Sequence, residues 1–404
     1  MRIATANQYD VSISTLQGRQ SQLQTTQEQL SSGQRVSQPS DDPTAAAEIE
    51  RSVATIGRLD ANERSLQASR NSMTLSESAL GDADNLLQQI RESMVQAGDG
   101  SYSDPQRAAL GQQIKSLRDQ LLTVANRSDG NGNYLFAGLG SNGPPFIDQS
   151  GGVTFTGVPG VTLTGNTDKY PLTVDGSLAF MGARSGNGSF VTAAGTNSNS
   201  GNPPAGWIDS GKVTDPTQLT GHNYTIQING NSPQQSFSVT DTDTGAIVAS
   251  NNFTAGQSVA FDGLSVNISG APVDGDQFTV APSTNTLGVF DVLDRTIADL
   301  NTPQRTGAQI SQSNSSDLRD LDAVMGNIEN IRSQVGTAMN NLDSSETRIS
   351  STKEYNQAQQ SNAQDLDMVQ GISDFQNQQT GYQAALQTYA MVQRMSLLNY
   401  LPSS

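Results

Sequence analysis

The chain has 404 residues, 34% of them hydrophobic, and carries a formal net charge of -17. This length predicts about two to four domains. The acidity favours solubility and disfavours binding to nucleic acid or anionic lipid through bulk electrostatics. Because the sequence contains no cysteine, disulfides, thiol chemistry and Cys-ligated zinc are excluded.

Membrane and targeting signals are also not evident. Residues 1–10 lack a cationic start followed by an apolar core, so we expect no cleavable signal peptide. No stretch approaches the roughly 20 apolar residues of a membrane span, so we expect no membrane partner.

The first predicted element is a helix from about Ile3 to Leu30, followed by the helix-breaking residues Gly33 and Pro39. It carries apolar side chains at intervals of seven residues, with one intermediate partner: Tyr9, Ile13, Leu16, Leu23 and Leu30. This spacing is typical of a coiled-coil seam.

A second helix is predicted to begin at Pro43, with Asp42 as its cap. Its apolar repeat of seven residues consists of Leu59, Leu66, Met73, Leu80, Leu87 and Met94. The intermediate positions, such as Glu63, Arg70 and Glu77, are mostly charged, so this seam is narrow. A third helical stripe, which ends near Gly130, contains Ile114, Leu117, Leu121 and Val124.

Beyond Gly140 the apolar pattern changes to alternation, which predicts strands between about residues 141 and 283. Asp262-Gly263 predicts a two-residue hairpin turn, and Asp175-Gly176 predicts a similar one. Further strands are predicted by alternation at Tyr224, Ile226, Ile228, Phe278 and Val280.

Helical periodicity returns after Pro282. One stripe contains Val289, Leu293, Ile297 and Leu300, and the next contains Leu321, Ile328, Val335, Leu342 and Ile349. The last helix carries Met368, Ile372, Phe375, Tyr382, Leu386 and Tyr389.

These elements predict an α+β multidomain fold. A long antiparallel helical bundle or coiled coil is built from both chain ends, and a β-rich, mostly antiparallel domain is inserted between them. We expect a terminal helical domain of residues 1–40 and 361–404, an inner helical bundle of 41–140 and 286–360, and a β-rich outer domain of 141–285.

Several segments resemble a known family. Residues 30–50, LSSGQRVSQPSDDPTAAAEIE, resemble the joint between the terminal and inner helical domains of flagellin and its relatives. Residues 133–146, NYLFAGLGSNGPPF, resemble the exit from the helical domain in the flagellar hook-associated protein 3 family. GNGSFVTAAGTNSNSG and GLSVNISGAPVDGDQFTVAPS also resemble that family's middle domain. The first motif alone does not distinguish this family from flagellin, whereas the others favour it.

The resemblance implies a structural component of the bacterial flagellum, a ring that joins the hook to the filament. It implies self-association, and partners that include hook-associated protein 1, flagellin, the filament capping protein and an export chaperone bound to the C-terminal helix. It also implies export through the flagellar type III apparatus to the cell exterior. Flagellin itself, or a secreted adhesin with a ligand-binding β domain, remains an alternative.

The residues expected at the assembly interface are Tyr9, Ile13, Leu16, Leu23, Leu30, Phe375, Tyr382, Leu386 and Tyr389. Spacing alone is equally compatible with an internal two-helix core. Because Gln20 and Gln27 occupy the alternate seam positions, we expect apolar burial to fall short of the entropy cost of ordering. Residues up to about Leu30 and after about Ala363 are therefore predicted to be mobile in the monomer.

Enzymatic and metal-binding motifs are weak. His222, the only histidine, lies in a Gly- and Thr-rich turn, where we expect an exposed loop residue. No G-x-S-x-G motif frames a nucleophile. Asp129, Asn131 and Asn133 begin like a calcium loop, but Tyr134 and Gly140 occupy positions that require Gly and Glu. We therefore expect no enzyme activity, no cofactor and no metal site.

Overall fold

The computed structural model describes residues 2–166 and 168–398. The chain divides into two compact units, and the boundaries fall within the two longest helices. Unit 1 consists of Met1–Arg64 and Ser345–Ser404, and unit 2 consists of Ser65–Ser344. Each unit has a core of its own.

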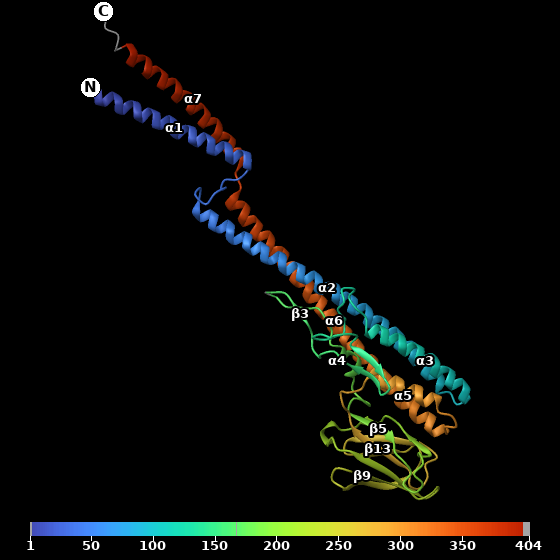
Figure 1. Ribbon diagram of the computed structural model, residues 1–404. Coiled ribbons are helices and arrows are strands. Elements are labelled where there is room, and N and C mark those ends of the chain that lie inside the picture. The colour runs from blue at the N-terminus through green and yellow to red at the C-terminus, as the bar shows by residue number, and fades with distance from the viewer. Residues whose placement is uncertain (1, 167, 399–404) are drawn as a thin grey trace, which may run out of the picture. The chain divides into compact units, whose positions relative to one another are not determined.

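The element order is helical at both ends and β-rich in the middle (Figure 1). The helices are α1 (Arg2–Ser32), α2 (Pro43–Ala97), α3 (Asp104–Ala125), α4 (Gly176–Met181), η1 (Pro216–Gln218), α5 (Val289–Asn301), α6 (Gly307–Gln364) and α7 (Met368–Leu398). The strands are β1 (Phe146–Gln149), β2 (Gly152–Phe155), β3 (Leu163–Thr164), β4 (Tyr170–Pro171), β5 (Phe190–Ala194), β6 (Gly206–Ile208), β7 (Lys212–Val213), β8 (Tyr224–Asn229), β9 (Gln235–Asp241), β10 (Ile247–Phe253), β11 (Ser258–Phe261), β12 (Leu264–Gly270) and β13 (Gln277–Pro282). This order confirms the predicted α+β class with an inserted β-rich segment.

Unit 1 contains α1, α7, the first part of α2 and the last part of α6. As predicted, α2 begins with an Asp cap: Oδ1 of Asp42 accepts hydrogen bonds from the N–H groups of Thr44 and Ala45, at 3.1 and 3.0 Å. Within this unit α2 and α6 are joined by Lys353, whose Nζ lies 2.7 Å from Asp60 and 3.2 Å from Glu63.

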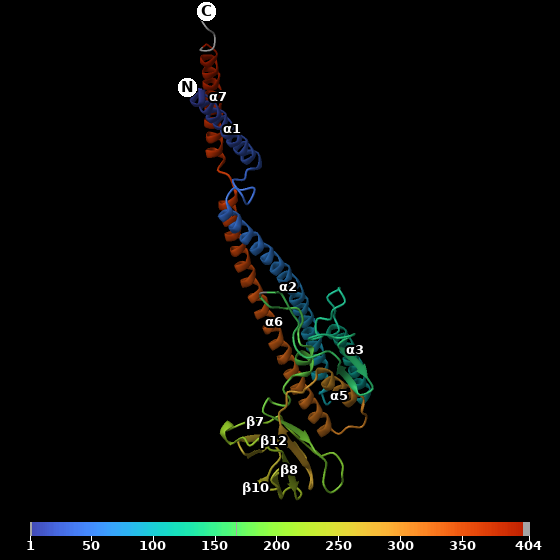
Figure 2. The ribbon, with the colours of Figure 1, turned by 60° about the vertical axis from the view of Figure 1, so that its left-hand side comes forward.

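The helical core of unit 2 follows the repeats of seven residues. Its buried members on α2 and α6 are Leu66, Met73, Leu80, Leu87, Met94, Leu321, Ile328, Val335 and Leu342. α3 packs against α5, and both lie beside the α2–α6 pair in two views (Figures 1 and 2). A seven-residue repeat keeps one narrow face toward the partner helix, which is why these positions are buried.

The charged residues that flank this stripe pair across the helices. Arg70 of α2 binds Asp343 of α6, Glu77 lies 2.7 Å from Arg332, and Arg91 lies 2.6 Å from Asp322. The order of these pairs shows that α2 and α6 run antiparallel. The charges expected from the narrow seam thus lie along its edges, where solvent still reaches them.

The β-rich segment contains two larger sheets that share one apolar core. One sheet has the order β10-β9-β8-β13-β5, and the other has the order β11-β12-β6 with β7 also paired to β12. Alternate residues of β8, Tyr224, Ile226 and Ile228, are buried in this core, as their spacing predicted. β1–β2 and β3–β4 form two small antiparallel pairs.

The two predicted Asp-Gly hairpins have different outcomes. Asp262 and Gly263 have φ angles of 41° and 75° and join β11 to β12, so this prediction is confirmed. The hairpin at Asp175-Gly176 is wrong, because Gly176 begins α4. Oδ1 of Asp175 accepts hydrogen bonds from the N–H groups of Ser177 and Leu178, which makes it a helix cap instead of a turn residue.

Among the helices in the described part of the chain, none combines the length and the apolar character needed to cross a bilayer.

Replacing Leu87 by Ala is expected to lower the free energy of unfolding by about 2–5 kcal/mol, because it leaves a cavity in the fully buried α2–α6 stripe. Val95→Ala on the same helix is the control, since Val95 is 51% exposed and should change stability by only about 0.5 kcal/mol. Urea unfolding followed by circular dichroism measures both. Equal losses would contradict the assignment of Leu87 to the core.

Candidate assembly interface

The terminal helices α1 and α7 pack against each other within unit 1 (Figure 1). The rings of Tyr9 and Tyr389 have centroids 5.4 Å apart and planes inclined by 57°. At the other end of the pair, Leu30 lies beside Gly371, where a Cβ atom would be 3.1 Å from Cδ2 of Leu30. These contacts show that the helices are antiparallel.

Most of the predicted interface residues lie at intermediate depth in this pair. The half-buried ones are Tyr9, Ile13, Leu16, Leu23, Leu30, Phe375, Tyr382 and Tyr389. Leu386 is different, because 43% of it is exposed. The structure therefore brings the N- and C-terminal stripes into one helical pair, while their role between chains stays a prediction.

Some seam residues were assigned wrongly from spacing. Gln20 and Gln27, which were expected in the seam, are exposed. Thr26 is buried instead, and its Oγ1 lies 2.8 Å from Oε1 of Gln378. The seam therefore advances by three residues from Leu23 to Thr26, where a step of four residues, to Gln27, was expected. Helical periodicity allows both steps. Gly381 was also missed; it faces the guanidinium of Arg19 on α1.

Several large apolar side chains of α1 and α7 are not covered by the pair. The exposed ones are Val11, Met368, Val369, Ile372, Leu386 and Met391, with exposed fractions between 43% and 81%. They form a set distinct from the half-buried seam residues. Met368, Val369 and Ile372 lie within about one turn of α7 and therefore share one face, and an exposed apolar patch of this kind marks a surface that contacts another protein.

Residues 30–50 form a compact joint in which the break between α1 and α2 lies beside the break between α6 and α7. The N–H of Arg35 donates to the carbonyl of Gln364 at 2.7 Å, and the N–H of Leu366 donates to that of Gly33 at 2.9 Å. Val36 is buried with Ala45 and Ala363. Gly33 has a φ of 71°, which ends α1 in the left-handed region that favours glycine. The motif therefore ties the two helix breaks together.

The second motif, residues 133–146, leads into an aromatic cluster of unit 2. The Phe146 ring is 5.3 Å from that of Phe180 and 6.1 Å from that of Phe290. Asn126, which directly follows α3, holds the same residue: its Nδ2 donates to the Phe146 carbonyl at 2.8 Å and its Oδ1 accepts from the Phe146 N–H at 2.9 Å. This packing fixes the point where the chain passes from α3 into the β-rich segment.

A buried guanidinium clamps the same region. Arg118 of α3 is 4% exposed and binds Asp148 of β1 and Asp294 of α5, in each case through two nitrogen atoms. The hydrogen bonds to Asp148 raise the pKa of Arg118, and in return they lower the pKa of Asp148. Because both carboxylates are satisfied by one residue, the clamp holds β1 against the helices.

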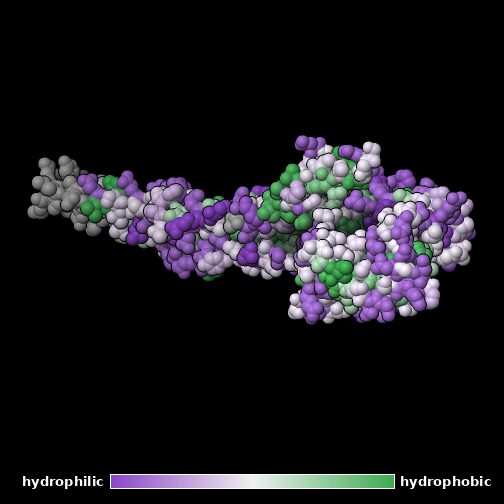
Figure 3. Space-filling view, turned by 90° about the horizontal axis from the view of Figure 1, so that it is seen from below, coloured by the Kyte–Doolittle hydropathy of each residue, from purple (hydrophilic) through white to green (hydrophobic). Residues whose placement is uncertain are grey.

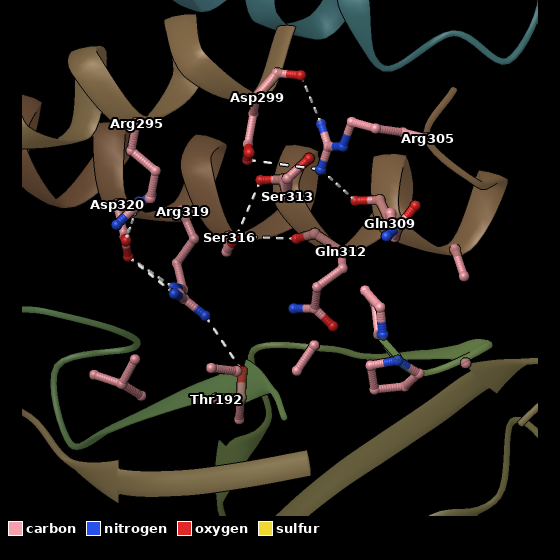
Figure 4. Close-up of a pocket in the computed structure, with 17 residues that line it drawn as sticks. Thr192, Arg295, Asp299, Arg305, Gln309, Gln312, Ser313, Ser316, Arg319 and Asp320 are labelled. Atoms are coloured by element: carbon pink, nitrogen blue, oxygen red, sulfur yellow. Dashed lines mark hydrogen bonds and ion pairs between the residues drawn. The ribbon is translucent and has the colours of Figure 1, made fainter. Parts of the chain in front are cut away.

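A cleft of about 330 Å³, lined by both polar and apolar side chains, separates the β-rich segment from the start of α6 (Figure 4). Two hydrogen bonds cross it: the Ile208 N–H donates to Oε1 of Gln312 at 2.8 Å, and Nη1 of Arg319 donates to Oγ1 of Thr192 at 3.3 Å. Arg319 also binds Asp320, so its charge is paired. The arrangement is that of a joint between two parts of unit 2.

A second set of charges lies at this cleft, where Arg295 and Asp320 are among the lining residues. Arg295 of α5 donates to Asp317 at 2.8 Å and to Asp320 at 2.7 Å. Burial raises the pKa of Asp317, although the neighbouring guanidinium opposes this shift. The three side chains join α5 to α6 and leave no unpaired charge among them.

His222 lies in a loop, as expected, and its side chain is 38% exposed, but it is paired with an acidic residue, which was not expected. Its Nδ1 lies 2.8 Å from Oδ2 of Asp241, and Asp243 is close enough for the three to share a cation. However, the carboxylates already accept backbone hydrogen bonds: Asp241 from the N–H of Asp243, and Asp243 from that of Asn223, both at 2.9 Å. The cluster is explained by the turn that it stabilises.

Asp129 behaves in the same way in the segment that begins like a calcium loop. Its Oδ1 accepts the N–H groups of Asn131 and Asn133 at 2.8 and 3.1 Å, and its Oδ2 accepts Nδ2 of Asn133 at 3.0 Å. Both oxygens thus cap the loop.

The pKa of His222 is expected to lie above its ordinary value because of the hydrogen bond to Asp241. The stabilisation from this pair is complete below the unfolded pKa of about 6.5 and is lost as the pH rises through the folded value. NMR titration of this single histidine measures the shift. Asp241→Asn should lower the pKa more than Asp243→Asn does; an equal effect would contradict the pairing.

The sequence matches three described protein regions. Residues 3–141 match the bacterial flagellin N-terminal helical region, and residues 318–401 match the bacterial flagellin C-terminal helical region. Residues 196–282, in the β-rich segment, match the D2-like domain of flagellar hook-associated protein 1. The two flagellin regions coincide with the helical ends of the chain.

Relatives with similar length are hook-associated proteins. Flagellar hook-associated protein 3 of Salmonella typhimurium is 27% identical over 98% of both chains. The crystal structure of the flagellar junction protein from Legionella pneumophila has a TM-score of 0.69 and 26% identity, covering 79% of this chain and all of that one. By contrast, an Escherichia coli flagellin is 34% identical over only 30% of this chain and 22% of its own.

The likeness to flagellin is therefore confined to a part of the sequence, whereas the likeness to hook-associated protein 3 includes the β-rich segment and the full length. The chain belongs to the flagellar hook-associated protein 3 family, within the flagellin-like proteins.

Proposed function

We propose that this protein is a structural component of the bacterial flagellum and forms, with further copies of itself, the junction ring between hook and filament. The observation that carries the proposal is the apolar set left uncovered by the α1–α7 pair, together with membership of the hook-associated protein 3 family. The family alone supports the flagellar location. The uncovered set supports assembly through the terminal helices.

The seam and the uncovered set have different roles in this proposal. Half-buried residues such as Leu16, Leu23 and Tyr382 hold α1 to α7 within one chain. Val369, which is 81% exposed, and Ile372, at 48%, instead contact the helices of neighbouring copies. Burying such side chains removes apolar surface from water, which favours association.

The terminal domain, residues 1–40 and 361–404, should gain much of its order from assembly. A two-helix pair with a half-buried seam buries less apolar surface than a closed bundle does, while the backbone entropy cost is the same. Neighbouring copies would supply the missing contacts. The terminal helices of the assembled copies would form an inner tube. The inner helices, residues 41–140 and 286–360, would surround this tube, and the β-rich residues 141–285 would lie outside it.

The partners follow from the position of a junction. Hook-associated protein 1 would contact the ring on the hook side, and flagellin or the filament capping protein would contact it on the other. The match of residues 196–282 to a domain of hook-associated protein 1 supports a structural kinship with that neighbour. An export chaperone would bind the C-terminal helix before secretion through the flagellar type III apparatus.

The proposal does not include catalysis. The charged residues described above, Arg118, Arg295 and Arg319 with their Asp partners, serve as clamps between elements. His222 is engaged with Asp241 in a turn. These roles support a structural scaffold.

A thin band at the hook boundary is expected when the protein is labelled with antibody on purified hook-filament complexes and viewed by electron microscopy. A junction ring contains copies at one level only, whereas a filament subunit is present along the whole length. Labelling along the entire filament would identify the chain as a flagellin and overturn the proposal.

Leu386→Asp is expected to abolish incorporation into the junction, because it places an unpaired charge in the apolar set that neighbouring chains bury. Motility and pelleting with hook-filament complexes measure the loss, and circular dichroism checks that the β-rich segment stays folded. Leu219→Asp is the control, since Leu219 is 39% exposed and lies outside the terminal helices. Retained motility of the Leu386 variant would refute this role.

A further inference from the structure

A second cleft of unit 2, with a volume of about 580 Å³, lies beside the two segments that join the larger sheets to α4 and α5. One side of it is formed by α6, and the other by these segments, with Arg184 and Asn285. The segments are tied to each other, because the Ser185 N–H donates to the Thr284 carbonyl at 2.9 Å. We call this cleft the connector cleft. It adjoins the cleft of Figure 4, since Arg319 lines both.

The connector cleft differs in charge from the chain as a whole. The sequence has 39 Asp and Glu residues against 22 Lys and Arg residues, yet none of the described residues that line this cleft is acidic. In the space-filling view, apolar surface gathers in separate patches between hydrophilic areas (Figure 3), and most of the charged side chains of the chain are carboxylates. An anion that enters the connector cleft therefore meets cations without meeting a carboxylate in its lining.

Arg184 is the cation that this cleft leaves available. Every other arginine of unit 2 forms an ion pair with Asp or Glu, whereas Arg184 forms none with the residues that the structure describes. Its Nε donates to Oδ1 of Asn285 at 3.1 Å, and its two terminal nitrogens have no partner among the described residues. A guanidinium held in this way presents the planar pair of donors that binds a carboxylate.

Side-chain amides supply the other polar groups of the cleft. Asn327 of α6 is fixed, because its Nδ2 donates to the carbonyls of Leu178 and Ala179 at 2.7 and 3.0 Å, and its Oδ1 is left to accept another hydrogen bond. The Nδ2 of Asn285 is left to donate one. Amides offer both donors and acceptors, as hydroxyl groups require. The described lining contains no aromatic or large apolar side chain, which favours a polar ligand.

We propose that the connector cleft binds a small hydroxylated carboxylate, namely a sugar acid of the hexuronate class. Arg184 holds the carboxylate, and the amides of Asn285 and Asn327 pair with hydroxyl groups. The volume of the cleft lies within the range of about 300–1,000 Å³ that is usual for small-ligand sites. An acidic protein side chain fits less well, because it would occupy the guanidinium and leave the amides without hydroxyl partners. This role is additional to the junction function and does not depend on it.

Galacturonate is the probe, and saturation-transfer NMR on the purified full chain measures its binding by titration. Arg184→Gln should weaken binding about tenfold or more, because it removes the charge-assisted hydrogen bonds to the carboxylate. Lys212→Gln is the matched control: Lys212 is also exposed, also lacks an ion pair with the described residues, and does not line the cleft. It should leave the affinity unchanged.

A second variant fills the cleft without touching a charge. Gly326 lines it, and a Cβ atom there would meet nothing within 4 Å, so Gly326→Leu is expected to fold and to block the site. Galactose, which lacks the carboxylate, and acetate, which lacks the hydroxyl groups, should bind at least tenfold more weakly than galacturonate does. Tighter binding of trigalacturonate would identify a polysaccharide as the source of the ligand, and equal binding would identify the free sugar acid.

Three results would overturn the proposal. The first is no saturation transfer to galacturonate. The second is an equal loss of binding in the Arg184 and Lys212 variants, which would indicate unspecific attraction to positive charge. The third is binding of acetate as tight as that of galacturonate, which would exclude recognition of a sugar. Circular dichroism checks the folding of each variant, and if Arg184→Gln does not fold, Gly326→Leu decides: unchanged binding by that variant would place the ligand elsewhere.

Discussion

The antiparallel packing of α2 against α6 is the interaction on which the rest of unit 2 depends. Its buried stripe runs from Leu66 to Met94 on one helix and from Leu321 to Leu342 on the other. Charged pairs such as Arg91–Asp322 along its edges fix the register. Because the two helices come from opposite ends of the sequence, everything between them must be inserted, and the Arg118 clamp then attaches the first inserted strand to the helical layer.

Repeats of seven residues predicted the helices well, because burial on one face of a long helix needs only regular spacing. The dipeptide Asp-Gly was less informative. At Asp262 it forms a hairpin turn, whereas at Asp175 the same pair begins a helix. The difference lies in whether the carboxylate caps the following N–H groups or leaves the backbone free to turn. That choice is set by tertiary packing around Phe136 and Phe146, which lie against Gly176, and local sequence does not reveal it.

The sequence predicted where the candidate interface lies along the chain, but it did not predict how deeply each residue is buried. Spacing placed Leu16, Leu23 and Tyr382 on one seam, and the structure brings the two stripes together. The spacing could not show that Thr26 takes the place of Gln27 in the seam, because residues three and four positions apart lie on the same helix face. Nor could it separate Leu386 from the seam residues, because exposure depends on which face meets the partner helix.

The distribution of charge explains how such an acidic chain could self-associate. Residues 368–391 of α7 contain a single charged side chain, Asp374, although the whole chain has a net charge of -17. The face that α7 offers to neighbouring copies is therefore nearly neutral. Acidic surfaces on two copies repel each other, so they disfavour contacts elsewhere on the molecule. The affinity of the contact itself comes from apolar burial.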